Sequence, residues 1–349
     1  MFGKIWKASK YYLFLGIGVF LVYYVFRNVN LSSLWEQMQT AKLSWLFLSF
    51  LCGIIAMVSR AWRWNILLEP LGYKPGLLNS FNAVSLGYFA NIGVPRIGEI
   101  IRCSVLNQTS KIPLTELIGT VILERVIDVV MLLSLIIVVI LSQVDLFGNF
   151  FMREVFGEKI DKINFLIELT GWWLVLIVPA LMIIGFFLIR GIFRQYGHIS
   201  LIKKIKQFTD GIRNGFISLF RLKKKGAFIF HTIFIWLNYY VMTWVCLYAY
   251  EPTSSLDAFD GLFLMVVGGL GMTAPVPGGI GAFHILVSNA LILYGITPII
   301  DPVSLKETFS PGLVFATLVH TTQFIMTICC GLFSLTMLVI FKRKNNANT

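Results

Sequence analysis

Charged residues are scarce in this sequence, and the acidic ones are in the minority. Only 13% of the 349 residues are Asp, Glu, Lys or Arg, whereas 57% are hydrophobic. An ordinary soluble domain has about 25% charged and roughly 45–50% apolar residues. This balance excludes a soluble globular domain, and the recurring apolar runs exclude a disordered chain. We expect residues 1–349 to form a single polytopic membrane domain.

The sequence also lacks the patterns of common enzyme and metal sites. Its five cysteines show neither metal nor redox spacing and lie in or beside apolar stretches, where cysteine behaves as a small hydrophobe. There is no P-loop, no nucleophile elbow and no His and carboxylate spacing of a metal hydrolase. We therefore predict no catalytic residue, no metal and no cofactor. His284 and His320 lie on apolar arms and are interpreted as packing residues, with proton coupling as the alternative.

Long apolar runs are what the sequence does have. Six of them are candidates for the roughly 17 to 25 residues that cross a bilayer. They lie at 11–26, 43–59, 117–141, 172–189, 227–248 and 313–341. The first follows basic residues, as a signal peptide would, but no small-residue cleavage site comes after it, so we expect an uncleaved anchor. The predicted fold class is an all-α integral membrane protein with about six spanning helices.

Basic residues indicate which side of the membrane each loop occupies. Most Lys and Arg lie in 1–10, 60–116, 190–226 and 342–349, and the intervening segments hold few. Because cytoplasmic loops carry such an excess, both termini are predicted to be cytoplasmic. The net charge of +12 does not indicate a nucleic-acid partner, since the basic residues lie between apolar runs and not on a basic face in water. We expect the basic loop 190–226 to lie near anionic head groups.

Two further apolar segments are interrupted by residues that break helices. Residues 77–94 contain several Asn and Gly and end at Pro95, and residues 258–297 consist of two apolar arms joined at 273–281. The charge pattern is kept only if neither segment crosses, so we predict two re-entrant helical hairpins that enter from opposite faces. The breaks resemble each other, with the sequences VPRIGE at 94–99 and VPGGIG at 276–281. An inverted-repeat transporter has such interrupted helices, and its binding site lies where the broken ends meet.

The second break is a candidate for holding a phosphate through backbone groups. Pro277 suits the first position of a helix, and it is followed by Gly278, Gly279 and Gly281. Glycines at a helix start leave backbone N–H groups uncovered, and these bind an anion with the help of the helix dipole. The alternative is that the glycines only permit close helix packing.

The first break offers charged side chains. A helical run after Pro95 would place Arg96, Glu99 and Arg102 on neighbouring faces. A glutamate between two arginines neutralises one and leaves a net positive site for a phosphate. The alternative is an interfacial ion pair on the cytoplasmic side. Asn91, which comes shortly before the break, joins these three residues as a candidate for substrate binding.

Other ionisable residues lie inside or at the end of predicted spans. Glu124 and Asp128 are four residues apart on one helix face, and Arg125 can reach Asp128. Such residues cost roughly 2.5 to 3.5 kcal/mol each on insertion scales, so they are either functional or join helices. Arg60 and Arg63, flanked by tryptophans at the end of the second span, are typical of arginines that snorkel to the interface. Head-group binding is their alternative role.

These motifs resemble, in order, the lysylphosphatidylglycerol synthase transmembrane-region family. They are SRAWRW at 59–64, FANIGVPRIGEIIR at 89–102, ERVID at 124–128 and PVPGGIG at 275–281. In the best understood members the membrane part is a lipid flippase, and a soluble C-terminal domain transfers an aminoacyl group from tRNA to phosphatidylglycerol. This sequence ends about eight residues after its last predicted span, so the resemblance implies the stand-alone, flippase-like branch. One departure is that Phe283 and His284 follow the glycine turn where relatives often have a carboxylate.

We therefore expect a lipid translocator that moves an anionic or modified polar lipid between the leaflets of a bacterial or archaeal cell membrane. Its partner would be a membrane phospholipid or a lipid-linked substrate. The alternative is an integral-membrane enzyme that acts on a lipid-linked phosphate, with Glu99, Glu124 or Asp128 as base or metal ligand. A membrane scaffold is a third class, but it leaves the buried charges unexplained. A homodimer and a separate partner enzyme both stay open.

Overall fold

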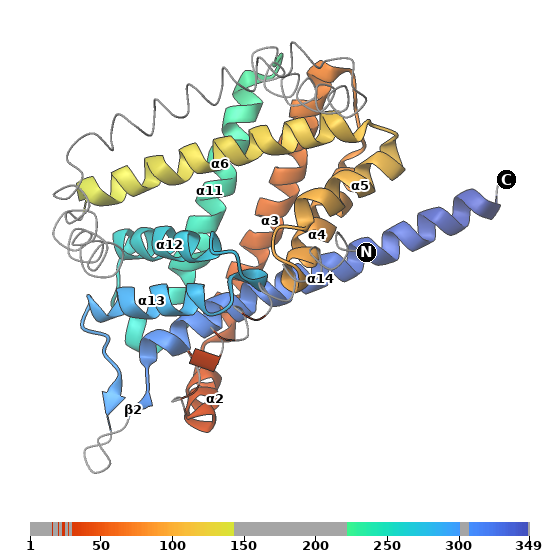
Figure 1. Ribbon diagram of the computed structural model, residues 1–349. Coiled ribbons are helices and arrows are strands. Elements are labelled where there is room, and N and C mark those ends of the chain that lie inside the picture. The colour runs from red at the N-terminus through yellow and green to blue at the C-terminus, as the bar shows by residue number, and fades with distance from the viewer. Residues whose placement is uncertain are drawn as a thin grey trace, which may run out of the picture.

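The computed structural model describes residues 30–142, 222–300 and 307–347, together with Gly16, Phe20, Tyr23, Tyr24 and Arg27. The predicted spans at 11–26 and 172–189 lie outside the described residues except for single positions, as do the N-terminal segment 1–10 and most of the loop 190–226. The described part is mainly helical (Figure 1). The predicted predominance of helices is therefore confirmed for these residues, which also contain one short strand pair.

The first described region contains five α-helices and one short 3₁₀ helix. They are α2 (Leu31–Gln39), α3 (Leu43–Leu68), η1 (Glu69–Leu71), α4 (Leu77–Gly93), α5 (Gly98–Ser110) and α6 (Leu114–Ser142). The side chain of Asn30 starts α2 by accepting hydrogen bonds from the backbone N–H groups of Ser32 and Ser33. Gly72, with φ 88°, ends the α3–η1 rod in the left-handed conformation that glycine adopts without strain.

The two later described ranges, 222–300 and 307–347, contain four further α-helices, two 3₁₀ helices and two very short strands. They are α11 (Lys225–Leu247), η3 (Glu251–Thr253), α12 (Ala258–Met272), η4 (Pro277–Gly279), α13 (Ala282–Ile292), β1 (Ile299–Ile300), β2 (Glu307–Phe309) and α14 (Pro311–Ala347). Asp257 caps α12 by accepting from two backbone N–H groups, and Asp260 accepts in return from the N–H of Asp257. The two strands pair antiparallel and form a small ribbon before α14.

Four of the described helices are long and apolar enough to cross a membrane. These stretches are Leu43–Leu71, Leu114–Ser142, Lys225–Leu247 and Pro311–Phe341. They contain the runs predicted at 43–59, 117–141 and 313–341 and nearly all of the run at 227–248. Large apolar side chains are exposed along them, including Val129, Leu133 and Ile137 on α6. Such a surface suits lipid and would be costly in water.

Helices α3 and α11 pack against each other in opposite directions (Figure 1). At one end the N–H of Lys42 donates to the carbonyl of Ala249 at 2.8 Å, and at the other Lys224 lies 3.1 Å from Glu69. In between, the buried hydroxyl of Ser49 donates to the carbonyl of Met242 at 3.0 Å. Lipid is as apolar as leucine, so packing and such hydrogen bonds, and not exclusion from water, hold the pair together.

Both predicted breaks interrupt helices in the structure. Between α4 and α5 the chain turns at 94–97, where Arg96 takes a left-handed conformation with φ 61°. Between α12 and α13 it turns at 273–281, where Gly278, Gly279 and Gly281 all have positive φ. That these hairpins enter a membrane from opposite faces remains a prediction.

The two breaks lie against each other. The Nη2 atom of Arg96 donates to the backbone carbonyl of Thr273 at 3.3 Å. A Cβ atom on Gly278 would lie 4.0 Å from the Cα of Ile92, near the end of α4. Two turns separated by about half of the chain thus meet in the fold.

Helices α4 and α5 approach closely at Gly87 and Gly98. A Cβ atom on Gly98 would collide with the carbonyl oxygen of Gly87 and would lie only 2.7 Å from the Oδ1 atom of Asn91. That Oδ1 atom accepts a hydrogen bond from the N–H of Gly98 at 2.7 Å. The hairpin therefore closes only because position 98 has no side chain.

We predict that Gly98→Ala destabilises the protein by about 1–3 kcal/mol, because the added methyl group must push α4 and α5 apart. Gly93→Ala is the matched control, since a Cβ atom at Gly93 would meet nothing within 4 Å. Thermal denaturation of the detergent-solubilised protein, followed by size-exclusion chromatography, measures the difference. Equal midpoints for the two variants would contradict the close packing.

Candidate functional site

Glu124 of α6 is the centre of a buried group of charges. Its side chain is fully buried, and both of its carboxylate oxygens accept hydrogen bonds from arginines. Oε1 accepts from Nη1 of Arg60 at 2.7 Å and from Nη2 of Arg63 at 3.1 Å. Oε2 accepts from Nη2 of Arg102 at 2.8 Å. One carboxylate thus joins three guanidinium groups, from α3 and α5, to α6.

Asp128 completes the group one helical turn further along α6. Its Oδ2 and Oδ1 atoms accept from Nη1 of Arg60 and Nη2 of Arg63, each at 2.8 Å. The spacing of four residues in α6 and three in α3 places both carboxylates and both arginines on facing helix surfaces. We call Arg60, Arg63, Arg102, Glu124 and Asp128 the arginine cluster.

Aromatic and hydroxyl groups hold the arginines of the cluster in place. The hydroxyl of Tyr239, on α11, accepts from Nε and Nη2 of Arg60 at 3.3 and 3.1 Å. The Cζ atom of Arg102 lies 4.7 Å from the ring centroid of Trp64, close enough for a cation–π contact. The indole N–H of Trp64 donates in turn to the hydroxyl of Thr120 at 3.0 Å.

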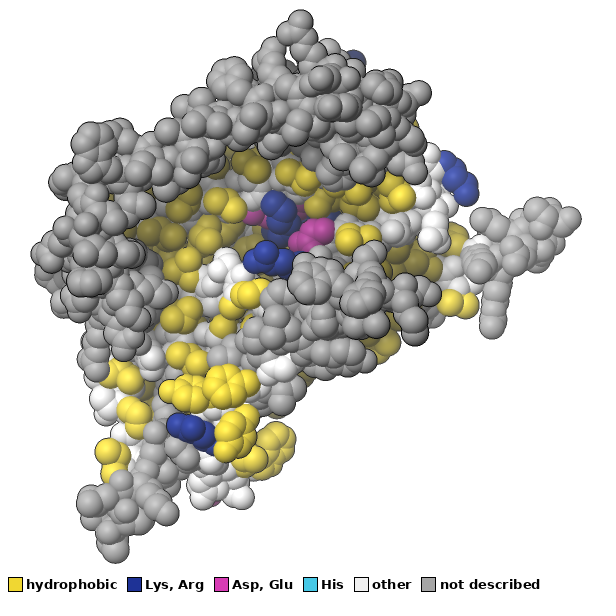
Figure 2. Space-filling view, viewed as in Figure 1, with side chains coloured by type: hydrophobic (Ala, Val, Ile, Leu, Met, Phe, Trp, Pro, Cys, Tyr) yellow, Lys and Arg dark blue, Asp and Glu magenta, His cyan; other side chains and the backbone are white. Residues whose placement is uncertain are grey.

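A second, looser ion pair lies beside the cluster. The Nε atom of Arg125 is 3.6 Å from Oε1 of Glu99, which is longer than a hydrogen bond. Arg125 also lies 3.7 Å from Asp128. The side chains of Arg125 and Glu99 are 42% and 31% exposed, whereas those of the arginine cluster are between 0% and 13% exposed. Figure 2 shows basic and acidic side chains together in a hollowed face among apolar ones.

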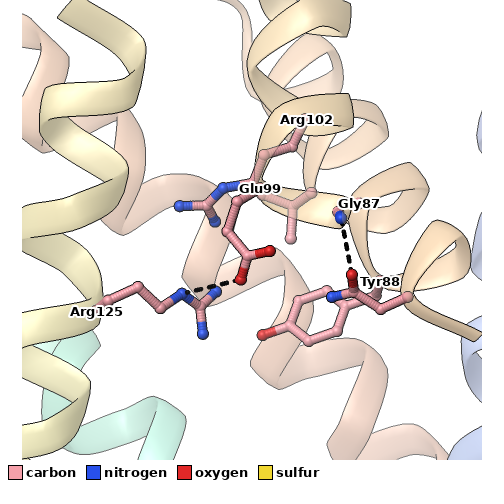
Figure 3. A pocket seen from close by; sticks show the side chains of 8 residues that line it. Gly87, Tyr88, Glu99, Arg102 and Arg125 are labelled. Atoms are coloured by element: carbon pink, nitrogen blue, oxygen red, sulfur yellow. Dashed lines mark hydrogen bonds and ion pairs between the residues drawn. The ribbon is translucent and has the colours of Figure 1, made fainter. Parts of the chain in front are cut away.

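A small cavity of about 40 Å³ lies beside the looser pair and Arg102 of the cluster. Side chains of α4, α5 and α6 line it, among them Tyr88, Asn91, Glu99, Arg102 and Arg125. Figure 3 shows Glu99, Arg102 and Arg125 converging on this space, with the Tyr88 ring facing it from α4. The cavity thus brings together five polar side chains from three helices.

The structure corrects two expectations for the arginines. Arg60 and Arg63 do not snorkel to an interface: α3 continues to Leu68, and the two residues are only 3% and 0% exposed. Arg96 does not share a helix with Glu99 and Arg102, because its left-handed backbone ends the turn and α5 begins at Gly98. Glu99 consequently pairs with Arg125 of α6 and not with its neighbours in sequence.

Two of the three glycine amides of the second turn already have partners within the turn. Pro277 does begin a helical turn, η4. The N–H of Gly279 donates to the carbonyl of Val276 at 3.2 Å, and that of Gly281 faces Nδ1 of His284 at 3.4 Å. The amides of Gly279 and Gly281 are therefore not free to hold an anion, and the expectation for Gly278 remains a prediction. None of the glycines of this turn lines the cavity beside the arginine cluster.

His284 and His320 lie together beside this turn, although 36 residues separate them in sequence. Their ring centroids are 4.9 Å apart, and Nε2 of His320 lies 2.9 Å from the carbonyl oxygen of Gly278. Both rings are buried. This arrangement fits a packing role, since each ring contacts the backbone that it supports. Among the residues that the structure describes, no three His, Cys, Asp or Glu side chains form a group that could hold a metal.

We predict that Glu124→Gln strongly destabilises the protein. Only the carboxylate of Asp128 would then remain to neutralise the three buried arginines of the cluster. Breaking a buried pair costs about 3–5 kcal/mol, which corresponds to a fall of roughly 10 °C in the melting temperature. The control is Glu36→Gln, which removes the same charge from an exposed position of α2. The double variant Glu124→Gln/Arg102→Gln should recover part of the loss. Additive effects of the two substitutions would contradict the pairing.

The comparisons with known proteins agree with this architecture. Residues 13–331 match the model of the family described as "Lysylphosphatidylglycerol synthase TM region". The chain is 21% identical over 307 residues to the UPF0104 membrane protein MJ1595 of Methanocaldococcus jannaschii. The aligned residues make up 84% of this chain and 87% of that protein. No solved structure matches the chain significantly. The chain is therefore a multi-pass membrane protein that belongs to the lysylphosphatidylglycerol synthase transmembrane-region family.

Proposed function

We propose that the protein is a lipid translocator that moves an anionic or modified polar lipid between leaflets. The observation that carries this proposal is the arginine cluster, which joins two helices of membrane-spanning length, α3 and α6, to the short helix α5, whose Arg102 lines a polar cavity. Ionisable residues within membrane helices are costly and mark pathways for polar substrates. The family is named after a region of an enzyme that makes a phospholipid, which agrees with a lipid as the molecule handled.

The positions of the charges along their helices support this role. Glu124 comes ten residues after the start of α6 at Leu114, or about 15 Å along the helix at 1.5 Å per residue. Arg60 comes eleven residues before Leu71, or about 16 Å from that end of its stretch. The hydrocarbon core is about 30 Å thick. A helix that enters this core at the end from which these distances are measured carries its charge near the middle of the membrane. A head group in transit needs polar partners at that depth.

The two broken helices supply the second support. Backbone that leaves the helical pattern at membrane depth is tolerated only where protein buries it or where it lines a watery cavity. The first break leads directly into α5, which carries Glu99 and Arg102 to the cavity, and Arg96 ties it to the second break. We infer a polar route along the junction of the two hairpins, through which the head group moves while the acyl chains stay in lipid.

The geometry favours translocation over catalysis on a lipid-linked phosphate. A base or a metal ligand needs a free oxygen, yet the oxygens of Glu124 and Asp128 all accept hydrogen bonds from arginines. Glu99 is the carboxylate of the three that faces the cavity. Turnover of a lipid phosphate by the purified protein would nevertheless support the enzyme and oppose our proposal.

We predict that Arg96→Ala slows lipid movement up to about fivefold while the protein still folds. The variant removes the donor of an exposed hydrogen bond to the Thr273 carbonyl, worth about 1 kcal/mol at most, that holds the two breaks of the proposed route together. The assay follows fluorescent lipids of differing head groups in liposomes, with a membrane-impermeant reductant reporting the outer leaflet. Lys74→Ala, at an exposed basic residue away from the breaks, is the matched control.

Two results would count against the proposal. Wild-type protein that moves none of the lipids would oppose a translocator. Equal rates for Arg96→Ala and wild type would remove the junction of the hairpins from the transport route.

A further inference from the structure

We propose that Glu99 is an internal substitute for phosphate: its carboxylate occupies the place between Arg125 and Arg102 where the phosphate of a ligand binds, and the ligand must displace it. This inference rests on the proposed lipid function, because it names the part of the lipid that the cavity recognises. It also identifies Arg102 and Arg125 as the residues that hold the phosphate.

Arg102 has donors that no residue of the described chain uses. Its side chain is 3% exposed, and it gives only Nη2 to Glu124. The Nε and Nη1 atoms are buried without a hydrogen-bond partner. A guanidinium carries five N–H groups, of which these two atoms bear three. Buried donors without partners are costly, more so on a charged group, so a site with three of them suits an acceptor.

Glu99 is held differently from the other carboxylates. Glu124 accepts at 2.7 to 3.1 Å, whereas Oε1 of Glu99 is 3.6 Å from Nε of Arg125, and Oε2 of Glu99 is buried with no partner among the residues that the structure describes. Its carboxylate therefore lies among arginines without forming a hydrogen bond of normal length to them. The side chain is partly exposed, which gives it room to turn out of the cavity.

The small volume of the cavity supports displacement. About 40 Å³ holds roughly three water molecules, at 10–15 Å³ each, and a lipid phosphate with its ester oxygens needs more. Withdrawal of the Glu99 side chain enlarges this space and frees Arg125 at the same time. Phosphate and Glu99 therefore compete for one position and do not share it.

Exchanging the Glu99 carboxylate for a phosphodiester leaves the net charge of the site unchanged. Four arginines and three carboxylates of the arginine cluster and the looser pair give a net charge of +1. A phosphodiester carries one negative charge, as does a carboxylate, so replacing one by the other leaves the charge of the cavity unchanged. A translocator has to bind its ligand and also release it. An internal competitor lowers affinity and so promotes release.

The experiment measures binding and transport for the same variants. The probes are dihexanoyl phosphatidylglycerol, inorganic phosphate and a neutral short-chain glycolipid, titrated calorimetrically into protein held in nanodiscs of neutral lipid. We expect Glu99→Gln to tighten binding of the phosphate probe about tenfold and to slow its transport. Arg125→Gln should weaken binding, and in Glu99→Gln/Arg125→Gln the gain should disappear. Glu36→Gln, with the same change of charge on α2, should bind as wild type does.

The outcomes separate the sources of the phosphate and the two proposals. A gain with phosphatidylglycerol alone assigns the site to a lipid, and an equal gain with inorganic phosphate assigns it to the free ion. Binding to Glu99→Gln that is unchanged, weaker or absent overturns the displacement model, even if the wild type transports lipid. A tenfold gain in a protein that moves no lipid would keep the phosphate site and reject the translocator.

Discussion

A carboxylate inside a membrane helix has to be neutralised by the protein itself, because no water is available to solvate it. In this protein Glu124 meets that requirement with three arginines from two other helices, and most of the architecture follows from the solution. The partners must lie within about 3 Å, so α3 and α5 are drawn against α6 at one depth. Asp128 then balances the arginines that Glu124 alone would leave in excess.

This constraint also explains why the first hairpin carries both structure and chemistry. Arg102 is the residue by which α5 joins the cluster, and Glu99 lies one turn earlier on the same helix. Fixing Arg102 therefore places Glu99 at the edge of the cavity, beside Arg125. The glycine contact between α4 and α5 keeps the hairpin narrow enough for this to occur. Tight pairs thus form the frame, and a loose pair faces the space where a ligand would bind.

Much of the fold followed from the sequence, because apolar runs and helix breakers report directly on helices and turns. The charged motifs were also found, since Arg and Glu are conspicuous in apolar surroundings. Their partners were not. Arg60 was expected at a helix end because the apolar run stops at 59, but Glu124 makes its burial tolerable. Tyr239 had no distinguishing signal among the aromatic residues of α11, and the backbone of Arg96 depends on tertiary contacts that no local pattern reveals.

The second turn is held from outside by two side chains, and each binds a main-chain oxygen. Arg96 donates to the carbonyl of Thr273, and His320 faces that of Gly278. Every amino acid supplies a carbonyl, so substitutions in this loop can alter its side chains without removing either acceptor. What must persist there is the path of the backbone, for which glycine is suited, whereas the opposite turn must retain a particular basic side chain. The two similar loops therefore tolerate substitution differently: one depends on the path of its backbone, and the other depends on a particular basic side chain.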